Sequence, residues 1–131
     1  MREIKYRMWN KKEKKMYQVG VLDFDYNQVY MTGYLNYTKS SYLYEDIELM
    51  QFTGLHDKNG KEIYEGDIVD VTRPCIYETG TIIFKNGCFF IKVKETLLAL
   101  WECEPNNYEL DVIGNIYENP DLLKGADNIE L

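Results

Sequence analysis

Tight-turn signals recur through the middle of this sequence at intervals too short to leave room for long helices. Gly54, Gly60 and Gly66 fall six residues apart, and Asn-Gly steps occur at residues 59–60 and 86–87. An Asn-Gly step between short extended runs is a strong hairpin signal, because a primed turn requires positive φ. No long segment carries a 3.6-residue hydrophobic period. The sequence therefore predicts an all-β fold with at most one or two short helices.

Short runs between these turns show the composition and the alternation expected of strands. Residues 4–8 alternate apolar and basic side chains, which predicts one buried and one cationic face. The expected strands lie within residues 4–8, 16–21, 29–37, 47–55, 68–71, 81–84, 89–93 and 108–117. Residues 38–44 are polar and tyrosine-rich and are expected to form a loop. Residues 95–101 fit a helix or a strand equally, and a helical turn is expected at residues 120–124.

The composition suits one small globular domain with an elaborated N-terminal part. The chain has 131 residues, of which 45% are hydrophobic and 28% charged. A chain of this length can bury a core without disulfides or metal ions. Tyrosine is unusually abundant, with 12 residues against 5 phenylalanines and 2 tryptophans. Tyrosine has high strand propensity and combines an apolar ring with a hydrated hydroxyl, which favours amphipathic β structure.

The charge is negative overall and unevenly distributed. The formal net charge of −7 disfavours general attraction to nucleic acids or anionic membranes. Residues 1–15 nevertheless carry seven basic and two acidic side chains, whereas residues 102–131 carry eight acidic side chains and one lysine. One interpretation is a basic face for a polyanion. The favoured one is mutual attraction of the two ends, within the chain or between subunits.

The sequence predicts a cytoplasmic protein. Met1 is followed directly by charged residues, which does not fit a signal peptide. The longest uninterrupted apolar stretch, residues 97–101, is far too short to span a membrane. Cys75, Cys88 and Cys103 are odd in number and form no CxxC pair. We therefore expect buried, reduced thiols and no zinc or redox motif.

Catalytic and metal-binding motifs are not recognisable. His56, the only histidine, precedes Asp57 and is expected to be a solvated loop residue. The segment 57–60 superficially resembles a calcium loop, but Ile68 stands where the twelfth-position carboxylate belongs. Carboxylates are plentiful, and spacing alone nominates no acid–base pair. The expectation is a protein without a cofactor or metal ion, and not an enzyme.

Several blocks of the sequence match one known family. These blocks are Leu49–Leu55, Asp57–Val69, the opening Arg2–Arg7 with Trp9, and the closing Val112–Pro120. They resemble the YopX family, and the likeness spans nearly the whole chain. The resemblance implies a protein encoded by phages or prophages, with no established activity, and an SH3-like barrel in the C-terminal half. Residues 20–45 and 70–105 depart from the recognised pattern.

The expected organisation is one YopX-like unit in three parts. Residues 1–45 should form N-terminal strands and a tyrosine-rich loop, residues 46–120 an SH3-like β-barrel, and residues 121–131 an acidic tail. The glycine-rich block is explained by folding alone, because each glycine falls where a β chain must reverse or bulge.

The predicted function is that of a non-enzymatic protein-binding or assembly module, acting on itself as a homo-oligomer or on a host or phage protein. Tyrosine-rich strands and exposed strand edges suit such contacts. One alternative is a nucleic-acid-binding small barrel that uses the basic N-terminal arm. A small-molecule-binding protein or enzyme is the remaining alternative. The predicted contact surface consists of Arg2, Lys5, Arg7, Trp9, Gln51, Thr53, Lys58 and Tyr64.

Overall fold

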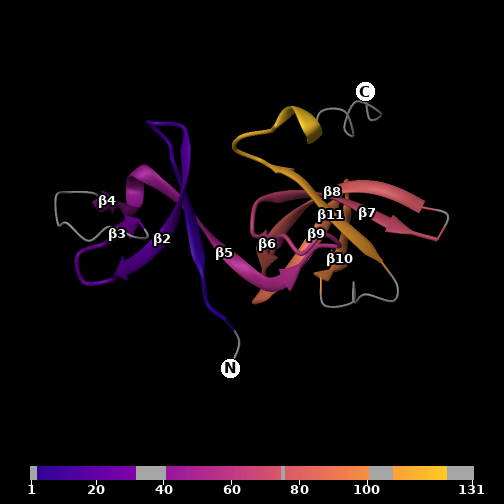
Figure 1. Cartoon of the computed structure of the whole chain (residues 1–131), viewed down its shortest axis with the longest axis horizontal. Coiled ribbons are helices and arrows are strands. Elements are labelled where there is room, and N and C mark those ends of the chain that lie inside the picture. Colours follow the sequence, from indigo (N-terminus) through magenta and orange to yellow (C-terminus); the bar gives the residue numbers. More distant parts are fainter. Residues whose placement is uncertain (1–2, 32–40, 75, 101–107, 124–131) are drawn as a thin grey trace. The chain divides into compact units, whose positions relative to one another are not determined.

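The computed structural model confirms an all-β protein and describes residues 3–31, 41–74, 76–100 and 108–123. The described residues form eleven strands, named β1 to β11 in chain order, and Figure 1 labels most of them. The chain divides into two compact units, Met1–Phe52 and Thr53–Leu131. The division falls inside strand β5, beyond the boundary expected at residue 45. Each unit has its own core and is described by itself.

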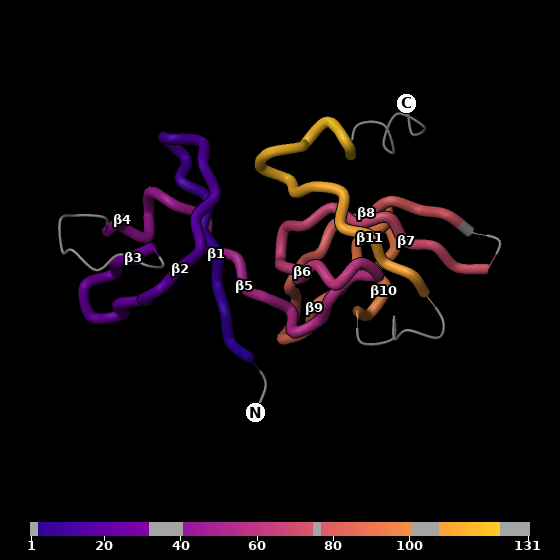
Figure 2. The backbone as a smooth tube through the Cα atoms, viewed as in Figure 1, coloured from indigo at the N-terminus to yellow at the C-terminus, as the bar shows by residue number. Residues whose placement is uncertain are grey.

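The N-terminal unit is an antiparallel sheet with the strand order β4-β3-β2-β1-β5. Strands β1 and β2 form a hairpin, which is drawn in indigo in the backbone trace (Figure 2). A 3-10 turn, η1, precedes β5, whose second half continues into the C-terminal unit. The bounds are β1 Tyr6–Asn10, β2 Lys15–Asp23, β3 Gln28–Met31, β4 Ser41–Leu43, η1 Tyr44–Asp46 and β5 Ile47–His56.

The core of this unit forms on one face of the sheet because side chains alternate along each strand. Met8 is fully buried and packs with Val29 and Ile47. Partly buried side chains from four strands and η1 complete this cluster, including Tyr17 and Leu49, which both lie opposite Met8. The prediction that Ile4 lies on the buried face of the strand is wrong, because Ile4 precedes β1 and is 63% exposed.

The C-terminal unit contains an antiparallel sheet with the strand order β10-β9-β8-β7-β11. Strand β6 lies beside β5. The bounds are β6 Glu62–Tyr64, β7 Asp67–Arg73, β8 Ile76–Lys85, β9 Cys88–Val93, β10 Thr96–Ala99 and β11 Glu109–Asn115. Residues 121–123 are helical, in agreement with the helical turn expected at residues 120–124.

A second hydrophobic core lies on one face of this sheet. Its buried members follow the period-two alternation that marked residues 68–71 and 89–93 as strands. They are Ile63, Val69, Val71, Ile82, Ile91, Val93, Leu100, Leu110 and Val112. The alternating residues of β7 and β11, such as Asp70 and Asp111, lie on the opposite face.

The predicted turns are confirmed by the backbone. Asn86 and Gly87 both have positive φ, 53° and 82°, as a primed two-residue turn between β8 and β9 requires. Gly60, with φ of 85°, lies in the turn between β5 and β6. The turn before Asp67 contains Gly66, with φ of 88°. These local signals predicted the chain reversals correctly.

Other expectations need correction. Residues 41–43 form strand β4, although a loop was expected there, because Ser41 and Tyr42 pair with β3. The ambiguous segment 95–101 includes strand β10, because Thr96 to Ala99 pair with β9. Cys88 is exposed, so the expectation of a buried thiol was wrong at this position. Cys75 and Cys103 lie outside the described residues.

The SH3-like barrel implied by the family resemblance is not confirmed. Within the described residues the five-stranded sheet is open, with β10 and β11 at its two edges. One backbone hydrogen bond links the turn after β5 to the edge strand β11, because the amide of Lys58 donates to the carbonyl of Leu110 at 2.9 Å. This single bond does not close the sheet.

Candidate functional site

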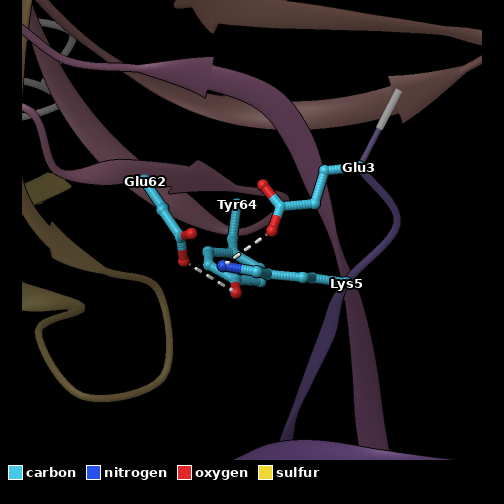
Figure 3. A network of polar contacts seen from close by, with 4 residues as sticks. All are labelled: Glu3, Lys5, Glu62 and Tyr64. Atoms are coloured by element: carbon cyan, nitrogen blue, oxygen red, sulfur yellow. Dashed lines mark hydrogen bonds and ion pairs between the residues drawn. The ribbon is translucent and has the colours of Figure 1, made fainter. Parts of the chain in front are cut away.

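Basic side chains of the N-terminal arm make contacts within the protein and do not form a free cationic surface. The Nζ of Lys5 lies 3.3 Å from a carboxylate oxygen of Glu3, as Figure 3 shows. The same ammonium group lies over the ring of Phe52, 5.6 Å from its centroid. An ion pair and a cation–π contact hold this lysine in place. Arg2, the first residue of the predicted surface, lies outside the described residues.

Lys5 and Arg7 lie on one face of the chain, as the period-two pattern predicted, and Trp9 continues that face. Arg7 is half-buried and lies opposite Gln18 on β2 and Met50 on β5. Trp9 is only 8% exposed. Its indole therefore packs inside the protein and presents little area to a partner.

The other predicted contact residues also have structural roles. Thr53 donates its hydroxyl to the carbonyl of Ile63 at 2.7 Å. Tyr64 is 3% exposed, and its hydroxyl donates to Glu62 at 3.2 Å (Figure 3). Gln51 is half-buried opposite Tyr6. Among these four residues only Lys58 is exposed. The contact role of this set remains a prediction.

Asp57 organises the turn between β5 and β6, a role that the sequence reasoning missed. Its Oδ1 accepts the amides of Asn59 at 2.8 Å and Lys61 at 2.9 Å, and its Oδ2 accepts the amide of Val112 at 2.9 Å. Burial alone would raise the pKa of Asp57, but these three amides lower it below the ordinary value. Aspartate three residues before a turn glycine was the local signal for this role.

The turn between β1 and β2 presents a group of lysines. We call residues 11–15 the lysine turn. Lys11, Lys12, Lys14 and Lys15 are all exposed. Lys11 pairs with Glu48, with 3.3 Å between Nζ and Oε1. These lysines count among the basic side chains of residues 1–15, but the predicted contact surface does not include them.

The turn between β2 and β3 presents aromatic side chains, and we call residues 24–27 the aromatic turn. Phe24 and Tyr26 expose 73% and 74% of their surfaces. The Oδ1 of Asp23 accepts the amides of Asp25 at 3.0 Å and Tyr26 at 3.1 Å, which fixes the backbone. The Phe24 ring meets the ring of Tyr44 edge-on, with 6.5 Å between centroids.

A polar row occupies the outer face of the C-terminal sheet. Asp70 and Asp111 lie directly opposite each other on β7 and β11. Tyr77 and Thr79 donate hydroxyls to Asp70 at 2.6 Å and 2.7 Å, and Asn59 donates to Asp111 at 3.3 Å. The hydrogen bond to Asp70 raises the pKa of the Tyr77 hydroxyl. These hydroxyl and amide donors partly offset the repulsion between two facing carboxylates.

Two features that would indicate other kinds of function are absent from the described parts of the chain. Residues 3–31, 41–74, 76–100 and 108–123 contain no cluster of three or more His, Cys, Asp or Glu side chains suited to a metal ion. No helix within the same ranges has the length and apolar character needed to cross a membrane. His56 is exposed at the end of β5.

Comparisons with known proteins identify a family model and two solved structures that are similar to this chain. The family model described as YopX protein matches residues 5–124. The crystal structure of protein EF1440 from Enterococcus faecalis matches with a TM-score of 0.68 and 29% identity, over 94% of this chain and 99% of that one. The structure of protein yopX from Bacillus subtilis shares the fold, with a TM-score of 0.63 and 20% identity over 90% and 96%. Curated proteins yield no match. The chain therefore belongs to the YopX family.

Proposed function

We propose that this protein is a non-enzymatic binding or assembly module that acts through contacts with proteins. The supporting observation is the aromatic turn, where Phe24 and Tyr26 leave about three-quarters of their surfaces exposed, at 73% and 74%. Exposed aromatic side chains grouped on a surface are the usual anchors of protein interfaces.

The neighbourhood of this turn extends the apolar surface. Val21 and Leu43 are 53% and 43% exposed. Leu43 lies opposite Gln28, directly after the aromatic turn, and the amide of Tyr44 donates to the carbonyl of Asn27 at 3.1 Å. The turn is therefore held against η1 before any partner arrives. A surface ordered in advance loses less conformational entropy on binding.

The partner is a second copy of the chain or a host or phage protein. Nucleic acid has weaker support on the basic arm, because Lys5 is paired with Glu3 and Arg7 is half-buried. The net charge of −7 also opposes a polyanion.

The test is the double variant Phe24→Ser with Tyr26→Ser. Sedimentation velocity over a wide concentration range measures self-association, and crosslinking in host cells measures capture of other proteins. We expect binding at least about tenfold weaker, because two anchors are lost, and stability within about 0.5 kcal/mol of wild type, because the sites are exposed. Ile4→Ser, which removes another exposed apolar side chain (63%) that precedes β1, is the control.

Two results would count against the proposal at different levels. Unchanged binding in the double variant would show that the aromatic turn is not the contact surface. A strictly monomeric wild-type protein that also captures no protein in host cells would remove the binding function itself.

A further inference from the structure

The lysine turn carries four lysines and one glutamate, and Lys11 pairs with Glu48, which leaves an excess of positive charge on the turn. Lys12, Lys14 and Lys15 are exposed and form no ion pair within the part of the chain that the structure describes. The carboxylate on this turn, Glu13, already accepts a hydrogen bond from the hydroxyl of Tyr17. Neighbouring like charges repel one another, and an anionic partner relieves that repulsion.

The shape of the lysine turn is fixed by its own hydrogen bonds. Asn10 is 4% exposed, and its Oδ1 accepts the amides of Lys12 at 2.9 Å and Glu13 at 2.8 Å. The amide of Lys14 donates to the carbonyl of Asn10 at 2.8 Å, and Lys14 has a left-handed φ of 59°. The lysines therefore project from an ordered backbone, which lowers the entropic cost of docking.

The C-terminal unit carries the complementary charge. Residues 1–52 contain eight basic and seven acidic side chains, whereas residues 53–131 contain seven basic and fifteen acidic ones. Glu109 and Asp111 lie on the outer face of β11, an edge strand of the described sheet. Every copy of the chain thus carries both a cationic turn and an anionic unit.

We propose that the lysine turn of one copy docks on the acidic C-terminal unit of a second copy. This inference rests on the proposed function, because it assigns one partner and one surface to a module that acts through protein contacts. Contacts of this kind accelerate encounter and select the partner by charge. A second copy is favoured as the partner because every copy carries, at Glu109 and Asp111 on the outer face of β11, an acidic surface that is complementary to the lysine turn.

The test compares two triple variants with the same change in net charge. Lys12→Glu, Lys14→Glu and Lys15→Glu reverse the lysine turn, whereas Lys85→Glu, Lys92→Glu and Lys94→Glu reverse three exposed lysines of the C-terminal unit. Sedimentation velocity is run at about 50 mM and about 500 mM sodium chloride, where screening differs strongly. We expect wild-type association to weaken at least about tenfold at high salt. The first variant should lose it at low salt. The second should retain it, because it adds negative charge to the unit on which the lysine turn docks.

A mixture of two variants with exchanged charges distinguishes loss of docking from misfolding of a variant. The lysine-turn variant is mixed with Glu109→Lys, Asp111→Lys protein, in which positive charge stands on β11. We expect neither variant to associate alone as strongly as wild type, and the mixture to form a complex. Circular dichroism of each variant verifies the β fold before mixing.

Each remaining outcome overturns the inference. Association that ignores salt and persists in the lysine-turn variant, while Phe24→Ser with Tyr26→Ser abolishes it, leaves the proposed function standing and removes this docking. A monomer at all concentrations shows that no second copy binds. A gel shift of single-stranded DNA that the lysine-turn variant loses, without any change in self-association, assigns the turn to nucleic acid.

Discussion

Single buried polar side chains hold the tight turns of this protein. Asp57, Asn10, Asp67 and Asn115 are buried, and each accepts at least one backbone amide close to it in the chain. Asp57 also reaches Val112, 55 residues away. A buried acceptor that satisfies several amides is costly to remove, because the amides then lose their partner without regaining water. These residues therefore act as structural anchors.

Replacing Asp57 with asparagine should lower the free energy of unfolding by about 1–3 kcal/mol at pH 7, because charged acceptors make the stronger hydrogen bonds. Folding lowers the pKa of Asp57 from 3.8, so the stabilisation by its ionised form is complete above that value. It is lost as the pH falls through the lower pKa of the folded state. The difference between wild type and variant should therefore shrink at low pH.

Urea denaturation at pH 7 and about pH 3 checks this prediction. Asp25→Asn, which alters an exposed carboxylate of the aromatic turn, is the control and should change stability little at either pH. A difference between wild type and Asp57→Asn that stays constant down to low pH would contradict the role assigned to the ionised carboxylate.

At the level of elements, the packing of β8 against β9 depends on a glycine in the middle of a strand. Gly80 lies opposite Val69. A Cβ atom built there would lie 2.7 Å from Cγ2 of Ile91, 2.8 Å from the carbonyl oxygen of Lys92 and 2.9 Å from Cγ2 of Val93. A glycine is required at position 80 because β9 approaches the backbone closely there, and not because the chain turns.

Gly80→Ala should destabilise the protein by about 1–3 kcal/mol, because the added methyl group overpacks the core and presses on a backbone carbonyl. Thermal unfolding followed by circular dichroism measures the effect. Lys85→Ala at the exposed end of the same strand should lie within about 0.5 kcal/mol of wild type. Equal stability of the two variants would show that β9 moves aside freely.

At the scale of the whole molecule, the two units have separate cores. One centres on Met8, Val29 and Ile47, and the other contains Val69, Ile82 and Ile91. A unit with its own core can open with its own free energy. The two units are covalently continuous through β5.

Ile82→Ala should cost about 2–5 kcal/mol in the C-terminal unit, and Met8→Ala a similar amount in the N-terminal unit, because each leaves a cavity in one core. Amide hydrogen exchange locates the effect. We expect Ile82→Ala to speed exchange mainly in β7 to β9, and Met8→Ala mainly in β1 to β3. A uniform increase across both units for either variant would mean that the chain opens as one cooperative block.

The candidate site was predictable only in part. Period-two alternation correctly grouped Lys5 and Arg7 on one face, because the pleat of a strand dictates that geometry. It did not show that Trp9 would be buried or that Lys5 would pair with Glu3. No local pattern marked the aromatic turn as a contact surface. The exposure of Phe24 depends on which surfaces its own unit covers, and no local pattern reports that.

The sequence by itself determined the all-β character and the places where the chain reverses. The turns at residues 59–60 and 86–87 follow from residues that accept positive φ, a requirement met within a few residues. Only the tertiary structure decided that β5 runs through the division into two units, that residues 96–99 form a strand, and that Asp57 reaches Val112. These features depend on pairing and burial between residues far apart in the chain, and local propensity does not specify such contacts.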